Sequence, residues 1–377
     1  MQDNDLMWNS TGLGTLGRMA IYKTVANPYE LAVADSHVTV IRPLKQFVLP
    51  EYLYYYFANP TVQSVIEDQA DGTTKQKELA TATIKAYLTP IPPLDEQRRI
   101  LTKLSEVLPV VKSYGAVYGE TVAMQDAFPE RLKKSILQEA VQGKLVPQDP
   151  SDEPAEALLE RIRAEKQRLI KEGKIKKDKH ESVIFRRDNS HYEKLDAAER
   201  CIDDELPFEI PDSWEWVRLG TVFQHNTGKA LNASNRDGEK LTYITTSNLY
   251  WDRFVLDNLK IMPFTDSEVD KCTVQQGDLL VCEGGDIGRA AIWGSNKPMR
   301  IQNHIHRLRA YVPVCTRFFY YLFYLYKGAG WIGGKGIAIQ GLSSNAIHNL
   351  LFPLPPLQEQ ERIVSAIDTA LDIVQKL

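Results

Sequence analysis

The sequence Ile91-Pro92-Pro93-Leu94-Asp95-Glu96-Gln97 returns near the far end of the chain as Leu354-Pro355-Pro356-Leu357-Gln358-Glu359-Gln360. The two copies lie 263 positions apart, as Leu94 and Leu357 show, and a helical pattern follows each of them. A duplication with so long a period indicates that one architecture is used twice. We therefore expect two similarly built domains, each followed by a helix.

The match extends upstream of the repeated phrase. Residues 14–22 pair with residues 285–293, and both stretches contain the pattern Gly-x-x-Gly-Arg. Residues 36–38 pair with residues 303–305, and the aromatic run 52–57 pairs with residues 317–322. Because the order is kept and the spacing drifts by only a few residues, the duplication covers the segment before each phrase as well.

The composition is ordinary for a soluble protein, and 377 residues suffice for two or three domains. The sequence has no run of eighteen apolar residues, and its first residues lack the pattern of a signal peptide. The four cysteines include no Cys-x-x-Cys pair, so neither a zinc site nor a disulfide framework is indicated. The sequence thus predicts a cytoplasmic protein that does not cross a membrane.

Charge is unevenly distributed along the chain, although the net charge is only -4. The stretch from Ile287 to Pro356 contains eight lysine and arginine residues and no aspartate or glutamate. Such a stretch favours a positive surface that faces a polyanion. The alternative is that the acidic residues between Asp266 and Asp286 lie close to these cations in the folded protein and neutralise their charge.

We expect an α+β fold with five segments. Residues 1–93 form a β-rich first domain and residues 206–356 a β-rich second domain, each with one aromatic helix whose rings belong to the core. Residues 94–180 form a first helical spacer, residues 181–205 a charged linker, and residues 357–377 the start of a second spacer.

Both spacers carry a helical seam, with apolar residues three and four positions apart. Such a seam can simply face the core of its own domain. Because it occurs twice at the same offset, we expect the two helices to pack antiparallel on each other, with Pro109 bending the first. The predicted packing residues are Ile100, Leu104, Val107, Val111, Tyr114, Ile363, Ile367 and Val374.

Several motifs together resemble the specificity subunit of type I restriction–modification systems. One is the pair of Pro-Pro-Leu-x-Glu-Gln phrases, and another is the entry Leu-Pro-x-x-Ile-Pro-x-x-Trp-x-Trp-Val-x-Leu-Gly at residues 206–220. The others are Gly-Asp-Leu-Leu at residues 277–280 and the spacer phrase at residues 137–145. The resemblance covers essentially the whole chain.

The resemblance implies a non-catalytic subunit that reads double-stranded DNA. Two β-rich target-recognition domains would each read one part of a bipartite site, and an antiparallel coiled-coil spacer of long helices would join them. Methyltransferase subunits would bring S-adenosylmethionine, and a motor–nuclease subunit would bring ATP and Mg²⁺. The chain itself would bind no cofactor, and it contains no catalytic or metal-binding motif.

The chain departs from the family pattern in two places. Residues 206–276 have no counterpart before the first domain, and the second spacer stops at Leu377. We expect only the second domain to be complete. Either the chain is a truncated or internally started product, or the first domain is completed by another chain, such as a second copy or another specificity fragment. The alternative is a truncated scaffold that assembles with or titrates partner subunits without full DNA recognition.

Side chains that read DNA should lie on loops rich in amides, hydroxyls and cations. The same residue types dominate ordinary turns, so each loop taken alone is equally consistent with a structural role. The candidates in the second domain are Lys229, Asn232, Thr245, Thr246, Ser247, Asn248, Arg289, Arg300, His304, Lys335, Gln340, Ser343 and Ser344.

Overall fold

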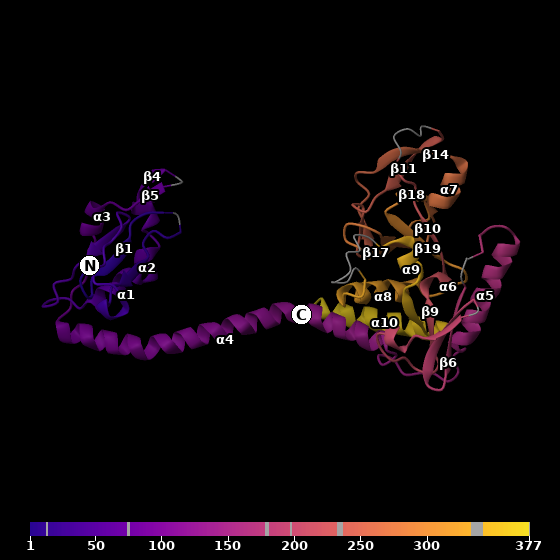
Figure 1. Ribbon diagram of the computed structural model, residues 1–377, viewed down its shortest axis with the longest axis horizontal. Helices are drawn as coiled ribbons and strands as arrows, with labels where there is room; N and C mark the ends of the chain where they lie inside the picture. The colour runs from indigo at the N-terminus through magenta and orange to yellow at the C-terminus, as the bar shows by residue number, and fades with distance from the viewer. Residues whose placement is uncertain are drawn as a thin grey trace. The chain divides into compact units, whose positions relative to one another are not determined.

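The computed structural model describes residues 1–12, 14–73, 76–177, 181–196, 198–231, 237–332 and 342–376, except for the side chains of Thr73 and Gln76. The chain divides into two compact units, Met1–Met124 (unit 1) and Gln125–Leu377 (unit 2), and Figure 1 labels many of their helices and strands. Each unit has its own hydrophobic core. Within the described residues, no helix combines the length and the apolar character needed to cross a membrane.

Unit 1 is built on a small antiparallel sheet. The strand order is β2-β1-β3, with β1 (Leu6–Asn9) between β2 (Met19–Ile21) and β3 (Val38–Ile41). Trp8 on β1 is fully buried against Phe57 of the aromatic helix α1. The remaining elements are η1 (Thr24–Ala26), α1 (Pro50–Ala58), α2 (Pro60–Gln63), η2 (Glu67–Gln69), β4 (Asp71–Thr73), β5 (Gln76–Glu78) and α3 (Thr81–Lys85).

Unit 2 contains two four-stranded sheets. The first has the order β10-β19-β16-β17 and is antiparallel throughout, and the second has the order β14-β11-β18-β15 and includes one parallel pair, β11 with β18. The strands of the first sheet are β10 (Phe223–Thr227), β16 (Leu279–Cys282), β17 (Ala290–Ile292) and β19 (Ile305–Ala310). Those of the second are β11 (Glu239–Ile244), β14 (Lys260–Phe264), β15 (Thr273–Val274) and β18 (Met299–Ile301).

Within the described part of residues 155–376, unit 2 also contains two strand pairs and seven helices. β9 (Glu215–Arg218) pairs with β20 (Leu351–Leu354), and β12 (Leu249–Tyr250) with β13 (Arg253–Phe254). Phe318, Phe319 and Phe323 of α8 are fully buried, as expected for the aromatic run of the second domain, whereas Tyr55 in the run of the first domain is 37% exposed. The helices are α5 (Ala155–Lys171), η3 (Asp203–Glu205), α6 (Leu219–Val222), α7 (Asp266–Cys272), α8 (Thr316–Gly328), α9 (Ser344–His348) and α10 (Leu357–Val374).

The duplication is confirmed by matching contacts in the two units. In unit 1 the buried carboxylate of Asp5 accepts two hydrogen bonds from the Arg42 guanidinium, at 2.8 Å each. In unit 2 the buried carboxylate of Asp278 accepts two from Arg309, at 2.8 and 2.6 Å. Asp5 lies just before β1 and Asp278 just before β16, so the two strands hold the same place in the two units.

The repeated phrase has the same structural role in both units. The side chain of Gln97 is fully buried, and its amide accepts from the N–H of Leu49 (2.8 Å) and donates to the carbonyl of Pro92 (2.7 Å). Gln360 makes the equivalent bonds, to the N–H of Cys315 (3.1 Å) and the carbonyl of Pro355 (2.9 Å). Leu49 and Cys315 precede the aromatic helices, so each glutamine ties the spacer to the aromatic helix of its unit.

The fold class is α+β with a long helical spacer, as expected. α4 (Leu94–Val141) is a single helix of 48 residues that continues through Pro109. In α10, Ile363 and Ile367 are buried in the core of unit 2, whereas Val111 and Tyr114 of α4 are 56% and 69% exposed. The antiparallel pairing of the two seams concerns both units and stays a prediction.

One expected segment is wrong, because residues 181–205 do not form a linker. β6 (Ser182–Arg187), β7 (Ser190–Leu195) and β8 (Ala198–Cys201) form an antiparallel sheet. Ile184 and Ile202 join a core cluster with Trp216 and Leu351. The apolar residues of this segment are few, but they pack against β9 and β20, and this burial orders the segment.

Candidate nucleic-acid interface

Polar loops of unit 2 meet where three strands end. Because β11 and β18 are parallel, their carboxyl ends lie at the same edge of the sheet. The N–H of Gln302, just after β18, donates to the carbonyl of Ile244 at the end of β11 (3.0 Å). The segment that follows β10 joins them, since the N–H of Lys229 donates to the carbonyl of Ile301 (3.0 Å).

A fourth segment reaches the same place from the neighbouring sheet. The N–H of Glu283, just after β16, donates to the carbonyl of His304 (2.9 Å). We use the name loop cluster for residues 228–229, 245–248, 283–289 and 302–304. The structure therefore brings together candidate DNA-reading residues that are up to 75 positions apart in the sequence, from Lys229 to His304.

The turn Thr245–Asn248 is held by its own side chains. The amide oxygen of Asn248 accepts from the N–H of Thr245 (2.9 Å) and from its hydroxyl (3.0 Å), and the amide nitrogen donates to the carbonyl of Val255 (3.0 Å). Thr245 and Asn248 are buried, whereas Ser247 is exposed and Thr246 is half-buried. Only Thr246 and Ser247 of this turn present side chains to a ligand.

Arg289 connects two segments of the loop cluster. Its guanidinium donates to the carbonyl of Thr246 (2.7 Å) and lies over the Tyr250 ring, 5.0 Å from the ring centre. Asp286 is 3.9 Å away. The side chain is 17% exposed, so Arg289 has a structural partner and also a limited surface for contact with a phosphate.

Lys229 is buried, although the sequence suggests it as a DNA contact. Its ammonium group donates to the carbonyl of Pro263 (2.7 Å) and to the carboxylate of Glu268 (2.6 Å). Its side chain is only 6% exposed. These contacts attach the end of β10 to α7 and give Lys229 a structural role.

The other candidates differ in their surroundings. Arg300 is half-buried and donates to the carbonyl of Pro298 (3.3 Å), and His304 is exposed, with Nδ1 3.6 Å from Glu283. Ser343 caps α9 by accepting from the N–H of Ala346 (3.2 Å). Ser344 lines a cavity outside the loop cluster. Asn232, Lys335 and Gln340 lie outside the described residues.

The sequence reasoning missed two amide side chains at the centre of the loop cluster. Gln302 and Asn303 are both half-buried, and Asn303 lines a cavity of about 420 Å³ together with Lys229 and Lys271. Their position directly after a strand, beside the candidate His304, is the signal that could have identified them. Amide side chains can pair bidentately with adenine, so this position has the chemistry of base reading.

Among the described residues, four of the seven cations of the acid-free stretch form ion pairs with acidic side chains, and three of these pairs use acids between Asp266 and Asp286, as in the alternative interpretation. No ion pair with an acidic side chain is found for Lys297, Arg300 or Arg307 within this part of the chain. Arg307 is buried and donates to the carbonyl of Thr273 (2.6 Å). The ion pairs are Arg289–Asp286, Arg309–Asp278, Arg317–Asp252 and Lys327–Asp286. The positive surface is therefore smaller than the sequence suggests.

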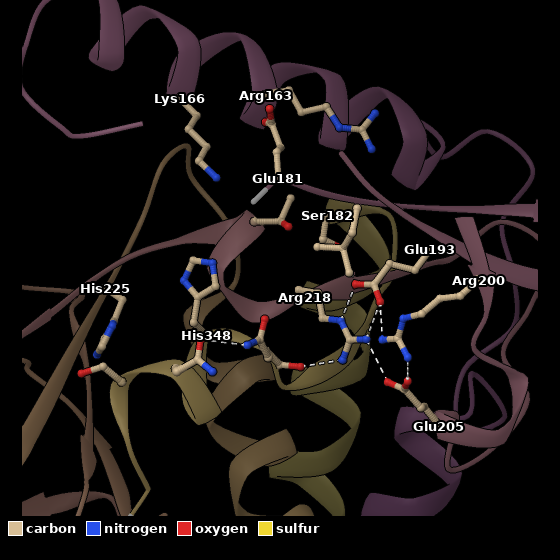
Figure 2. A pocket seen from close by; sticks show the side chains of 15 residues that line it. Arg163, Lys166, Glu181, Ser182, Glu193, Arg200, Glu205, Arg218, His225 and His348 are labelled. Carbon is tan, nitrogen blue, oxygen red and sulfur yellow. Dashed lines mark hydrogen bonds and ion pairs between the residues drawn. The ribbon is translucent and has the colours of Figure 1, made fainter. Parts of the chain in front are cut away.

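A cavity of about 850 Å³ lies between α5, the sheet β6-β7-β8 and α9. Figure 2 shows the ion-pair network on one side of it, centred on Glu193 and Arg218, with Arg200 and Glu205 beside them. Glu193 and Arg218 come from β7 and β9, so the network joins the sheet that replaces the expected linker to the second domain. Within the described residues, no group of three or more histidine, cysteine or acidic side chains is placed to hold a metal ion.

Two buried histidines form a directed chain of hydrogen bonds. Nε2 of His306 lies 2.6 Å from the carbonyl of Leu342, which can only accept, so this nitrogen carries a hydrogen. Nδ1 of neutral His306 then accepts from Nε2 of His225 at 2.8 Å. Burial is the main cause that lowers the pKa of His225 to about 3, and the repulsion that its charged form would meet from Arg307, and from His306 and His348 when they are protonated, adds to it.

The lowered pKa of His225 predicts that the folded protein loses stability in acid. The folded-state pKa is below the unfolded value of about 6.5, so this contribution is fully present above pH 6.5 and is lost as the pH falls towards 3. Between pH 7.5 and 5.5 we expect His225 to reduce the free energy of unfolding by about 1 kcal/mol. Denaturant unfolding of the native chain and of His225→Gln at both pH values measures this difference, and equal losses in the two proteins would contradict the prediction.

The comparisons with known proteins point to one family. The family model described as "Type I restriction modification DNA specificity domain" matches residues 1–109 and 211–376. The EcoAI specificity subunit of Escherichia coli is 26% identical over 96% of this chain and 66% of its own length. The EcoEI specificity subunit of the same organism is 24% identical over 92% of this chain and 64% of its own length. The chain thus spans about two thirds of the length of these relatives.

Solved structures have the same fold. The HsdS subunit from Thermoanaerobacter tengcongensis superposes over 100% of this chain and 75% of its own, with a TM-score of 0.50 and 18% identity. A chain from a structure of a type I restriction–modification system superposes over 100% and 76%, with a TM-score of 0.52 and 19% identity.

Proposed function

Because the chain belongs to the family of type I restriction modification DNA specificity domains, we propose that it is a non-catalytic DNA-recognition subunit. In this proposal unit 2 reads one part of a bipartite DNA site. The chain also holds methyltransferase subunits and a motor–nuclease subunit, and those partners bring S-adenosylmethionine, ATP and Mg²⁺. The observation that carries the proposal is the family match over both units.

The duplicated architecture supports a two-part site. In each of the two similarly built units, a buried glutamine lies near the start of the spacer helix. Two such units are suited to a ligand that has two half-sites. α4 has 48 residues, which at about 1.5 Å per residue gives a helix of about 72 Å. A helix of fixed length is a suitable element for setting the separation of half-sites.

The loop cluster is the proposed DNA-reading surface of unit 2. Ser247, Gln302, Asn303 and His304 offer the donors and acceptors that distinguish bases, and Arg300 offers a charge for phosphate. Thr246, Arg289, Ser344, Asn232, Lys335 and Gln340 remain candidates. Lys229, Thr245, Asn248 and Ser343 would act indirectly, by holding the loops in place.

Affinity for duplex DNA at several salt concentrations tests the proposal. The purified chain, alone and with its methyltransferase subunits, is mixed with a pool of randomised duplexes between 50 and 200 mM salt. A sequence-specific subunit enriches a defined sequence, and its affinity falls steeply with salt because phosphate contacts release counterions. A complex with methyltransferase but without sequence enrichment would show instead that the chain is a scaffold.

Two kinds of variant should separate the role of Gln302 in the loop cluster from that of Arg300 on the adjoining strand β18. Arg300→Ala should weaken binding to all duplexes alike and reduce the slope of log affinity against log salt by about 1. Gln302→Ala should instead reduce discrimination at one base pair by about 1–3 kcal/mol, a factor of about 5 to 150. Competition binding measures both effects. The exposed Lys194 on β7 offers a control, and if Lys194→Ala acted like Arg300→Ala, the assignment would be wrong.

A further inference from the structure

The cavity between α5, the sheet β6-β7-β8 and α9 has the size of a ligand site. Its volume of about 850 Å³ falls in the range of about 300–1,000 Å³ that is typical of sites for small organic molecules. Figure 2 shows that Lys166 from α5 and His348 from α9 point toward one another across this space. The polar lining of the cavity indicates the chemical groups that a ligand would carry.

The lining of the cavity has a net positive charge. Four lysine and arginine side chains and three glutamate side chains line it, and two cations and two acids balance one another in the ion-pair network. Lys166, Arg163 and Glu181 are the remaining charges, and Lys166 is only 6% exposed. For Arg163 and Glu181, no hydrogen bond or ion pair is found within the described part of the chain. An anionic group beside Lys166 would offset the excess charge, and a hydroxyl or N–H group beside Glu181 would satisfy its carboxylate.

One ring nitrogen of His225 is an acceptor without a partner. The carbonyl of Leu342 can only accept, so Nε2 of His306 donates to it, and Nδ1 of His306 accepts from Nε2 of His225. The lowered pKa keeps His225 neutral, and because its one hydrogen is on Nε2, its Nδ1 can only accept. No hydrogen bond to this Nδ1 is found among the described residues, and His225 lines the cavity. A ligand should therefore donate a hydrogen bond to Nδ1.

A chain of hydrogen bonds connects His225 with the loop cluster. Beyond His306 it continues from the N–H of Leu342 to the carbonyl of Glu283 (2.8 Å), and from the N–H of Glu283 to the carbonyl of His304 (2.9 Å). Every donor in this chain points in the same direction, from His225 towards His304. Because hydrogen bonds arranged in this way strengthen one another, a donor at Nδ1 of His225 would strengthen the contacts within the loop cluster.

We propose that this cavity binds a nucleoside monophosphate, and that the bound nucleotide strengthens the loop cluster through His225 and His306. The phosphate would lie at Lys166, a ribose hydroxyl would donate to Glu181, and an N–H group of the base would donate to Nδ1 of His225. A nucleotide is an organic anion of suitable size that combines these three groups. The effect on DNA recognition rests on the function proposed above, whereas the binding site does not.

Adenosine 5′-monophosphate (AMP) is the probe, and it is titrated into the full chain in a calorimeter. We expect one site with half-saturation at or below about 100 µM. Adenosine and inorganic phosphate should each bind at least about tenfold more weakly, because each lacks one of the groups that the cavity recognises. No binding of AMP at about 1 mM would overturn the proposal. Inorganic phosphate that bound as tightly as AMP would also overturn it, because the site would then recognise only an anion.

Two substitutions at His225 separate the binding of AMP from its effect on the loop cluster. Glutamine places an amide N–H near the position of Nε2 and no acceptor near that of Nδ1, so His225→Gln should weaken AMP binding about tenfold. Asparagine places its oxygen near the position of Nδ1 and no donor near that of Nε2. His225→Asn should therefore bind AMP within about threefold of the native chain but lose the connection to His306. If His225→Gln bound AMP as tightly as the native chain, the proposal would be wrong.

A substitution on α5 tests the anionic end of the ligand. Lys166→Met removes the ammonium group, keeps much of the side-chain length, and should weaken AMP binding about tenfold. Lys171→Met is the matched control, since Lys171 is exposed at the end of the same helix. An equal loss of affinity in the two variants would contradict the placement of the phosphate.

Amide hydrogen exchange measures the effect on the loop cluster without DNA. Saturating AMP should slow exchange at Leu342 and Glu283 about fivefold in the native chain but not in His225→Asn. It should also tighten the binding of an enriched duplex about fivefold. Unchanged exchange in the native chain would overturn the coupling. If AMP binds and slows exchange but no duplex is enriched, the function proposed above fails and the nucleotide site is supported. If a duplex is enriched but AMP does not bind, only the nucleotide site is wrong.

Discussion

Replacing Glu193 with alanine is expected to lower the free energy of unfolding of unit 2 by about 3–5 kcal/mol. The Glu193 carboxylate is buried and accepts two hydrogen bonds from Arg218, both at 2.8 Å. It also accepts from Arg200 (2.5 Å) and from Ser182 (2.6 Å). Without the carboxylate, the guanidinium of Arg218, whose side chain is 9% exposed, would lose its best partner in a site that water reaches poorly.

Because the pKa of Glu193 is lowered in the folded protein, the contribution of this residue to stability should depend on pH. Burial by itself raises the pKa of the carboxyl, but hydrogen bonds from Arg218, Ser182 and Arg200 together lower it to about 2. Because this value lies below the unfolded one, the stabilisation is complete above about pH 4.5 and is lost as the pH falls towards 2. The native chain should therefore lose more stability than Glu193→Ala over this range.

Denaturant unfolding of the native chain and of three variants, Glu193→Ala, Glu193→Gln and Glu199→Ala, tests the role of Glu193. The control is Glu199→Ala, because Glu199 pairs with Arg187 on an exposed face and should contribute less than about 1 kcal/mol. Glu193→Gln keeps the shape of the side chain and removes its charge. If Glu193→Ala were no less stable than Glu199→Ala, the network would not hold the sheet β6-β7-β8 to the second domain.

The duplication could be read from the sequence because it depends on local phrases. The order of matching segments and the common offset predicted two similarly built units, and the Asp5–Arg42 and Asp278–Arg309 pairs confirm it. The role of the repeated glutamine could not be predicted in the same way. Its partner is the N–H before an aromatic helix 45 or 48 residues upstream, and only the fold brings the two together.

The sheet β6-β7-β8 was missed because its composition is charged. The turn between β6 and β7 is Asp188-Asn189, and both residues have positive φ, 51° and 63°. Such a two-residue turn matches the twist of a hairpin, and Asp and Asn are among the residues that adopt it. A search for turn residues between two short runs of strand-like sequence would have identified this hairpin. The high content of charged residues led instead to the prediction of a linker.

The candidate DNA-reading residues were predicted from their residue types. The residue type does not determine whether a side chain is buried in the folded protein. Lys229 was selected for its charge, but its ammonium group is bound by Glu268, which is 39 positions away. Gln302 and Asn303 were overlooked, although they directly follow β18 and lie beside the candidate His304. Their place in the loop cluster depends on the parallel pairing of β11 and β18. That pairing cannot be predicted from local sequence patterns.

Replacing Gly228 with alanine is expected to destabilise unit 2 by about 3 kcal/mol and to distort the loop cluster. A Cβ atom on Gly228 would lie 2.0 Å from the carbonyl oxygen of Ile301 and 2.5 Å from the carbonyl carbon of Gln302. These are backbone atoms, which cannot move aside as a flexible side chain can. The end of β10 would therefore have to separate from the end of β18, and the bond from Lys229 N–H to Ile301 would be lost.

The control for Gly228 is Gly294, where an added Cβ would meet no atom within 4 Å. Gly294→Ala should leave the free energy of unfolding within about 0.5 kcal/mol of the native value. Measuring the binding of duplex DNA as well as unfolding separates the effect of Gly228→Ala on stability from its effect on DNA recognition. If the loop cluster reads DNA, Gly228→Ala should reduce the preference for the enriched sequence at least tenfold under conditions where the protein is still folded. A folded Gly228→Ala that kept its full preference would place the reading surface elsewhere, because the substitution moves the ends of β10 and β18 apart whatever binds there.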